Sequence, residues 1–196
     1  MTDDTAAFWD ERYRAQEAIP ERGPAGFLVE NLHLLPPAGA VLDIAMGSGR
    51  NALFLAARGY DVTGIDISAV AAERCREEAA RLGLHISAIC ADLASYQLPE
   101  SAFDVILNLY YLQRDLYPRV ERALTPGGLL VFETFTTEQR QEGWGPTQDE
   151  HLLRPRELPS LFPGLEQLLY REGVAESERG IKHVAGLVAR RPAPEA

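Results

Sequence analysis

Residues 40–68 constrain the fold more than any other part of this chain. Two short apolar runs, 41–44 and 60–65, flank a glycine-containing turn and a segment with helical spacing at 51–57. Short apolar runs that alternate with a helical pattern are typical of a strand–helix–strand unit in a parallel sheet. The small residues of the turn at 45–49 let the backbone come close to a ligand. This stretch therefore predicts one half of a nucleotide-binding sheet.

The remaining patterns extend this unit into a larger sheet. The first strand is predicted at 40–44, further strands at 85–91, 103–109 and 129–134, and helices at 5–15, 24–35, 69–82 and 112–124. Ser68 is a good N-cap for the third of these helices, and Gly83 ends it. Near the end of the chain, strands at 165–171 and 182–190 follow each other without a helix, joined by a polar connection at 173–180. These patterns predict a doubly wound, mostly parallel α/β sheet of seven strands with a C-terminal antiparallel hairpin.

The length of 196 residues is typical of one domain, which we expect to span 1–196. Within it, we expect residues 1–36 to form an N-terminal helical cap and the Pro/Ala-rich residues 191–196 to be a flexible tail. The polar segment 136–155 is long for a loop in a compact domain, and such loops tend to be lids or disordered segments.

The composition excludes several classes of partner. The formal net charge of −10 argues against nucleic acid and against an anionic membrane surface, both of which favour basic patches. The start of the chain lacks the apolar core of a signal peptide. Cys75 and Cys90 lie far apart in the sequence and fit reduced thiols in a cytoplasmic protein. The four histidines are scattered, so no metal site is predicted.

Two carboxylates indicate which nucleotide the turn would hold. A dinucleotide site favours G-x-G-x-x-G, whereas the turn here reads A-x-G-x-G and is followed by Arg50 and Asn51. Asp43, just before the glycines, would repel a pyrophosphate but suits a ligand with a cationic amino acid part, such as S-adenosylmethionine (SAM). Asp66, which follows the second strand, can accept both hydroxyls of an adenosine ribose. An NAD-dependent reductase and a turn without a ligand are the less favoured alternatives.

At these residues the chain resembles a known family. Residues 40–68 resemble motif I and the following acidic strand end of class I SAM-dependent methyltransferases. The run 49–62 is similar to the tellurite-resistance methyltransferases, and 8–13 resembles a segment of related small-molecule methyltransferases. Two positions depart from the family pattern: Ala45 stands where glycine is usual, and Met46 replaces a small residue or cysteine. Alanine is the smallest change from glycine, so we expect binding to survive it.

The resemblance implies a role for each cofactor residue. Asp43 would lie near the SAM ammonium, Asp66 would bind the ribose, and Asp92 would accept from the adenine amino group. Ile67 would pack on the adenine, and a backbone carbonyl near Asn108 would contact the ammonium. The whole implied set is Tyr13, Asp43, Ala45, Met46, Gly47, Gly49, Arg50, Asn51, Asp66, Ile67, Asp92, Leu93, Asn108 and Leu109.

Several of these residues have a second interpretation. Asp92 is also placed to cap a turn, and Asn108 is also a common strand-end residue. Arg50 has three possible partners: the methionine carboxylate, an anionic substrate, or an acidic neighbour such as Asp43 or Asp10. Tyr13 either closes over the cofactor or only docks its helix, together with Phe8 and Trp9.

The methyl acceptor is less constrained. A sulfonium is an excellent leaving group, so a soft nucleophile such as a thiolate or a selenium or tellurium anion needs no general base. No catalytic residue is assigned, and each acceptor-pocket candidate is equally compatible with a surface or core role. The candidates are Tyr110, Tyr111, Arg114, Glu133, Thr134, Trp144, Arg154 and His183.

The sequence therefore predicts a SAM-dependent methyltransferase acting on a small molecule, as a monomer or a homodimer. The alternatives are a protein side-chain methyltransferase and a non-catalytic SAM-binding protein. Residues 108–111 are superficially similar to the N-P-P-Y element of amino-methylating nucleic acid enzymes, but they lack both prolines.

Overall fold

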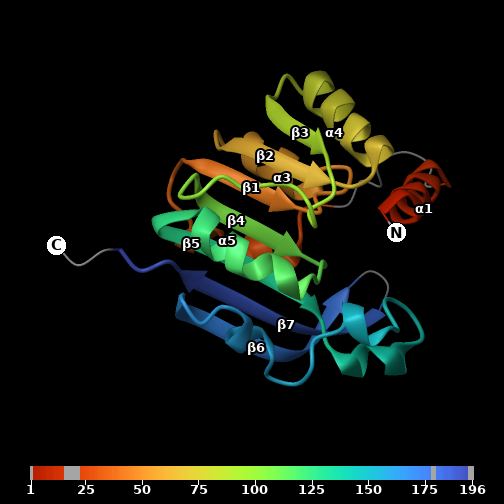
Figure 1. Ribbon diagram of the computed structural model, residues 1–196, viewed down its shortest axis with the longest axis vertical. Helices are drawn as coiled ribbons and strands as arrows, with labels where there is room; N and C mark the ends of the chain where they lie inside the picture. Colours follow the sequence, from red (N-terminus) through yellow and green to blue (C-terminus); the bar gives the residue numbers. More distant parts are fainter. Residues whose placement is uncertain (1, 16–22, 178–179, 194–196) are drawn as a thin grey trace.

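The computed structural model describes residues 2–15, 23–177 and 180–193. Within these residues, seven strands form one sheet in the order β3-β2-β1-β4-β5-β7-β6. β7 runs antiparallel to both β5 and β6, and all other neighbouring strands pair in parallel (Figure 1). The predicted fold class is therefore confirmed. The strands are β1 (Ala40–Ile44), β2 (Asp61–Asp66), β3 (Ile86–Cys90), β4 (Phe103–Leu109), β5 (Leu124–Phe135), β6 (Glu166–Ser177) and β7 (Gly180–Arg190).

Helices cover both faces of the sheet, because its central strands are apolar on both sides. Along β1, Val41 packs in one core with α2, α3 and α4, whereas Leu42 packs in the other core with α5. The α-helices are α1 (Thr2–Ala15), α2 (Gly26–Glu30), α3 (Arg50–Ala56), α4 (Ala69–Arg81) and α5 (Tyr117–Ala123). The short 3₁₀ helices are η1 (Leu32–Leu34), η2 (Arg114–Leu116), η3 (Thr137–Glu142), η4 (Asp149–His151) and η5 (Leu158–Leu161).

Two predicted helices are shorter than their apolar patterns. The pattern 24–35 divides into α2 and η1, because the side-chain Nδ2 of Asn31 donates to the Phe27 carbonyl at 2.8 Å and ends the first helix. The pattern 112–124, expected to be irregular near Pro118, divides into η2 and α5. Proline has no N–H and favours the first turn of a helix, so α5 begins just before Pro118.

The terminal hairpin is longer than predicted. The polarity of residues 173–180 predicts a loop between two strands. In the structure, β6 continues to Ser177 and pairs with β7 as far as Gly180. Since β6 is the edge strand and its side chains are mostly exposed, its sequence is polar enough to resemble a loop.

The segment 136–155 makes contacts within itself and with the rest of the molecule. Thr136 and Leu153 form a β-bridge inside it, and Leu152 and Leu153 are buried. The Arg114 side chain donates to the carbonyls of Glu150 and Leu152 at 3.2 and 2.9 Å.

Parts of the predicted cap and tail, residues 1, 16–22 and 194–196, lie outside the described residues. The described part of the cap comprises α1, α2 and η1. Among the described helices, none combines the length and the hydropathy that a membrane span requires.

Gly49 allows a close approach between α3 and α4. Its φ is 88°, and an added Cβ would lie 2.4 Å from the Cys75 Sγ, whereas Gly59 has the same φ and no atom within 4 Å. We expect Gly59→Ala to lower the free energy of unfolding by about 1–2 kcal/mol through backbone strain alone. Gly49→Ala should cost about 1–3 kcal/mol more, through overpacking. Urea denaturation measures both, and equal losses would show that Cys75 moves aside freely.

Candidate functional site

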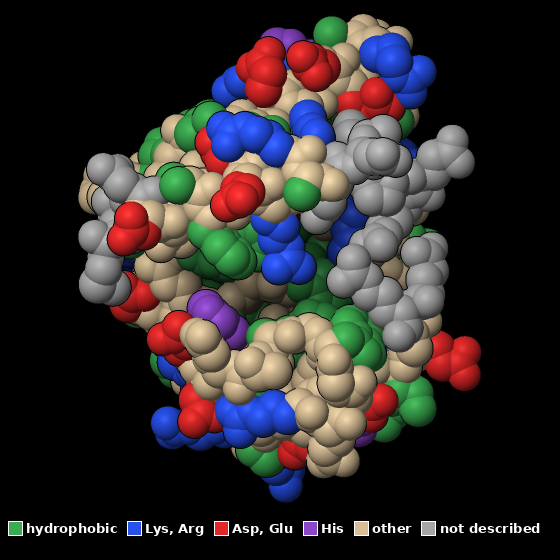
Figure 2. Space-filling view, turned by 90° about the vertical axis from the view of Figure 1, so that its right-hand side faces the viewer, with side chains coloured by type: hydrophobic (Ala, Val, Ile, Leu, Met, Phe, Trp, Pro, Cys, Tyr) green, Lys and Arg blue, Asp and Glu red, His purple; other side chains and the backbone are tan. Residues whose placement is uncertain are grey.

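A cavity of about 1160 Å³ lies at the carboxyl ends of the parallel strands. Figure 2 shows it as a recess with hydrophobic and basic side chains at its edge. Ligands of open α/β sheets bind at this edge, where the strand order reverses beside β1. The volume exceeds the roughly 300–1000 Å³ of common ligand pockets, so the cavity has room for two molecules.

The turn after β1 forms the floor of the cavity. Ala45 and Gly47 have φ values of 51° and 59°, so the chain makes a tight turn that exposes backbone to the cavity. An added Cβ at Gly47 would lie 2.7 Å from the Tyr13 Oη. One at Gly64 would lie 2.1 Å from the Met46 Sδ, so the glycine on β2 makes room for the large residue in the turn.

Asp66 fixes this turn to the end of β2. Its two carboxylate oxygens accept from the Gly47 N–H at 2.8 Å and from the Ser68 N–H at 2.9 Å. Burial raises the pKa of Asp66, although both hydrogen bonds favour the ionised form. Each oxygen keeps a further lone pair for a ligand hydroxyl.

Helix α1 forms one wall of the cavity. Asp10 anchors it by accepting from the Ser68 Oγ at 2.6 Å and from the Val70 N–H at 3.2 Å, at the start of α4 (Figure 1). Trp9 and Tyr13 line the cavity. Phe8, which would dock the helix with them in the alternative interpretation, is 57% exposed. Burial raises the pKa of Tyr13 to about 12, so its hydroxyl is protonated at neutral pH.

Two polar groups behind the cavity wall lack partners. The Asp43 Oδ2 and the Asn108 Oδ1 are buried without a hydrogen bond to the described residues. They lie at the ends of the paired strands β1 and β4. Burial raises the pKa of Asp43 to about 7, against the lowering effect of the Arg50 charge and the Ala52 N–H. This end of the sheet is therefore prepared for a cation.

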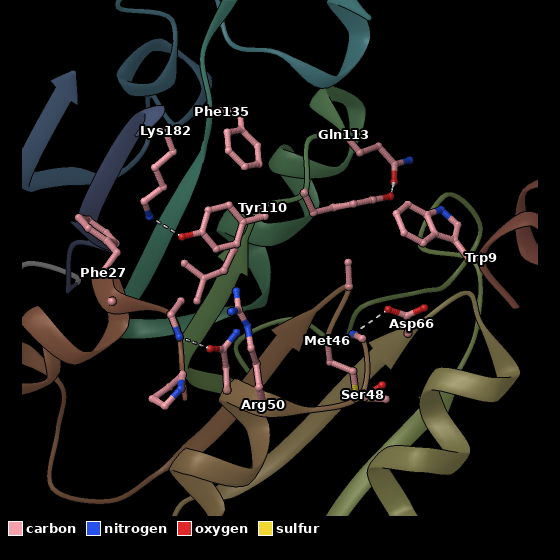
Figure 3. Close-up of a pocket in the computed structure, with 18 of the residues that line it drawn as sticks. Trp9, Phe27, Met46, Ser48, Arg50, Asp66, Tyr110, Gln113, Phe135 and Lys182 are labelled. Atoms are coloured by element: carbon pink, nitrogen blue, oxygen red, sulfur yellow. Dashed lines mark hydrogen bonds between the residues drawn. The ribbon is translucent and has the colours of Figure 1, made fainter. Parts of the chain in front are cut away.

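A network of charged groups occupies the opposite end of the cavity. Glu133, at 0% exposure, accepts from the Lys182 Nζ at 2.7 Å, the Tyr110 Oη at 2.7 Å and the Arg171 Nη2 at 3.0 Å. The Lys182 Nζ also donates to the Tyr110 Oη at 2.6 Å. In Figure 3, Lys182, Tyr110 and Phe27 lie on one side of the cavity and Asp66 and Trp9 on the other, with Met46 between them.

Most of the predicted site residues come together around this cavity. Those that line it are Tyr13, Ala45, Met46, Gly47, Arg50, Asn51, Asp66, Ile67, Asp92, Leu93, Leu109, Tyr110, Tyr111 and Trp144. Asp92 also caps a turn, since its Oδ1 accepts from the Ala94 N–H at 2.8 Å, which confirms the capping interpretation, whereas its contact with adenine stays a prediction. The Asn51 Oδ1 accepts from the Ala25 N–H at 2.9 Å.

The other predicted residues lie outside the cavity lining. Asp43 and Asn108 lie behind its wall, and Gly49 packs on Cys75. Three acceptor candidates are held elsewhere: Arg114 by an ion pair with Glu157 at 2.6 Å, His183 beside Glu142 in a separate groove, and Arg154 on the exposed surface. Thr134 is buried in β5, and Glu133 is the buried acceptor of the charged network.

The structure also brings residues to the cavity that the sequence patterns did not indicate. Among them are Phe27, Glu30, Gln113, Phe135, Arg171 and Lys182. Lys182 is distinctive in the sequence, because it is the only lysine among the 19 lysine and arginine residues.

Comparisons with known proteins find methyltransferases among the similar sequences. A family model described as a methyltransferase domain matches residues 41–128, which include the turn and both carboxylates. The chain is 29% identical over 175 residues to the uncharacterized methyltransferase Rv0089 of Mycobacterium tuberculosis, and the match covers 71% of this chain and 87% of that protein.

Solved structures share the whole fold. A protein described as converting a disulfide bond into a thioacetal group during echinomycin biosynthesis superposes with a TM-score of 0.77 at 21% identity, over 98% of this chain and 94% of that one. TehB from Haemophilus influenzae superposes with a TM-score of 0.72 at 22% identity, over 95% of this chain and 66% of that one. TehB is thus one of several similar folds and does not single out the tellurite-resistance enzymes.

The residues present fit SAM. The buried Asp43 Oδ2 has no hydrogen-bond partner among the described residues, and a cation such as the SAM ammonium would satisfy it. Asp66 keeps free lone pairs beside a glycine turn. Among the described residues, no three potential metal ligands are grouped. The sheet has the strand order of class I SAM-dependent methyltransferases, and residues 41–128 within it match a SAM-dependent methyltransferase domain.

Proposed function

We propose that this methyltransferase acts on a small molecule that reaches the cavity already ionised. The observation that carries the proposal is the arrangement of one continuous cavity, with a cofactor half around Asp66 and a second half around Tyr110 and Lys182. A macromolecular acceptor would need an open surface, whereas this second half is walled by Phe27, Phe135 and other side chains.

In the cofactor half, we place the ribose hydroxyls on Asp66 and the ammonium toward Asp43. Tyr13 and the turn at Gly47 would enclose the methionine part, and Asp92 would reach the adenine. Leu93 and Ile67 provide apolar contact for the adenine ring.

SAM supplies an activated methyl group that transfers by in-line displacement. The chain's part is to orient the acceptor and exclude water. Burial and the neighbouring Glu133 carboxylate raise the pKa of Tyr110 far above its usual range, so this hydroxyl stays protonated and does not act as a base. Both oxygens of Glu133 are already occupied. This favours acceptors that ionise without help from either group: thiolates, soft tellurium or selenium anions, and carboxylates.

Calorimetric titration tests the proposed function. SAM and its demethylated product, S-adenosylhomocysteine, should both bind with one site per chain, and NADH should give no heat of binding. Because burial raises the pKa of Asp43 to about 7, a ligand ammonium nearby should lower that pKa and release a proton below pH 7. Affinity should then rise with pH toward 7 and level off above it.

Two buffers of different ionisation enthalpy measure this proton release. The apparent binding enthalpy below pH 7 should differ between the buffers for the parent and agree for Asp43→Asn, which cannot titrate. Binding of NADH alone would contradict the proposed function. Binding of SAM without proton release would contradict only the placement of the ammonium near Asp43.

A further inference from the structure

Lys182 is the only lysine of the chain, and it lies in the cavity. The other 18 of the 19 lysine and arginine residues are arginines, including Arg50 and Arg171 in the same cavity. Lysine presents a compact ammonium, whereas arginine presents a broad planar fork. The chain therefore has the more compact cation at position 182, which is buried with 7% of the residue exposed.

The hydrogen bonds of Lys182 are incomplete. Its ammonium has three N–H groups, of which one donates to the Tyr110 Oη and one to the Glu133 Oε1. The Tyr110 hydroxyl donates to Glu133 in turn, so the three groups form a closed triangle. Within the described part of the chain, the third N–H of Lys182 has no acceptor, and this side chain lines the cavity.

The charges around the triangle leave positive charge uncompensated. Glu133 faces two cations, Lys182 and Arg171, and the second of these is also paired with Glu30 at 2.6 Å. The Arg50 Cζ lies 5.5 Å from the centre of the Tyr110 ring. Its guanidinium makes no hydrogen bond or ion pair with the described residues. Lys182 lies 5.0 Å from the centre of the same ring. Glu133 and Glu30 thus balance the charges of Lys182 and Arg171, and Arg50 adds a further positive charge beside the Tyr110 ring.

We propose that Lys182 and Arg50 bind the carboxylate of an organic acid, and that one of its oxygens accepts the methyl group. This inference rests on the proposed function and names its acceptor. A carboxylate matches both donors, because it takes the single N–H of an ammonium and the paired N–H groups of a guanidinium. The neighbouring rings of Phe27, Phe135 and Trp144 would hold an apolar or aromatic body.

The chemical step balances without a base. A lone pair of the carboxylate oxygen forms the new O–C bond, the C–S bond of the sulfonium breaks, and its electron pair stays on sulfur. The anion becomes a neutral methyl ester, the sulfonium becomes a thioether, and no proton moves. Lys182 and Arg50 then no longer face a bound anion, because the ester is neutral, and this favours release of the ester.

Phenylacetate, phenylacetamide and phenylmethanethiol distinguish the acceptor classes, because they share one ring. With SAM, we expect methyl phenylacetate as the product identified by mass spectrometry, and a far slower reaction with the other two. If SAM binds but only the thiol is methylated, the carboxylate inference fails while the proposed function stands. If neither SAM nor S-adenosylhomocysteine binds, the proposed function fails as well.

Binding is measured separately from turnover. In calorimetry on protein saturated with S-adenosylhomocysteine, Lys182→Met should weaken phenylacetate binding at least about tenfold, the effect of one charge-assisted hydrogen bond. Arg190→Met is the matched control, since it removes an exposed charge from the same strand and should leave affinity unchanged. Retained S-adenosylhomocysteine binding shows that each variant is folded. Equal phenylacetate affinity in parent and Lys182→Met would overturn the inference.

The single lysine also gives a spectroscopic test. Incorporation of ¹⁵N-lysine should produce one side-chain ammonium resonance. In protein loaded with S-adenosylhomocysteine, phenylacetate should shift this resonance and phenylacetamide should not. An unmoved resonance at saturating phenylacetate would show that Lys182 does not contact the acid.

Discussion

Replacing Asp66 by alanine is expected to weaken SAM binding about a hundredfold or more. A carboxylate that accepts from two ribose hydroxyls makes charge-assisted hydrogen bonds worth about 1.5–3 kcal/mol each. The variant also releases the Gly47 N–H at 2.8 Å and the Ser68 N–H at 2.9 Å, so the turn that supports the methionine part loses its attachment to β2. Calorimetry or equilibrium dialysis with SAM measures the loss.

Two companion variants separate the causes. Asp66→Asn keeps the shape of the side chain but removes its charge, so its loss should be smaller than that of alanine. Asp61→Ala removes an exposed carboxylate from the start of the same strand and should leave SAM affinity unchanged. If Asp66→Ala bound SAM as tightly as the parent, the cofactor would lie elsewhere in the cavity.

Replacing Glu133 by leucine is expected to lower the free energy of unfolding by about 3–5 kcal/mol. Removal of one partner from a buried ion pair leaves the other charge desolvated and uncompensated, and that loss is typically of this size. Here the Lys182 ammonium, one N–H of Arg171 and the Tyr110 hydroxyl would all lose the Glu133 carboxylate as their acceptor. Urea denaturation measures the change.

Matched variants test whether the buried charge is the cause. Glu166→Leu breaks the exposed pair with Arg190 on the same hairpin, where the loss should be below about 1 kcal/mol. The double variant Glu133→Leu with Lys182→Leu should be more stable than Glu133→Leu alone, because no lysine charge is then left unpaired. A double variant that is less stable than the single one would refute this account.

The sequence predicts the sheet well because its signals are local. The central strands are short apolar runs, and β1 and β4 have the predicted bounds. The Ser68 Oγ accepts from the Ala71 N–H at 3.1 Å, as an N-cap should. Predictions fail where one polar side chain ends a helix within an apolar pattern, as Asn31 does for α2. They also fail where strand pairing extends through a polar segment, as in β6.

The same distinction applies to the site. Asp43, Asp66 and the turn follow directly from one strand–helix–strand unit, so their grouping could be predicted. Lys182 and Glu133 meet only because β7 inserts beside β5, a long-range pairing that no local pattern indicates. Arg114 lies close in sequence to Tyr110 but turns away, because Glu157 and two backbone carbonyls bind it.

The anchoring of α1 links the cofactor half of the cavity to the start of the chain. Trp9 and Tyr13 contribute to the cavity wall only while Asp10 holds the start of α4. By thermodynamic reciprocity, whatever free energy the docked helix adds to ligand binding, the bound ligand returns to helix docking. Cofactor occupancy and the order of the first turns of the chain are therefore a single coupled equilibrium. An alteration of the Asp10 anchor, remote from any reacting atom, will register as a change in cofactor affinity.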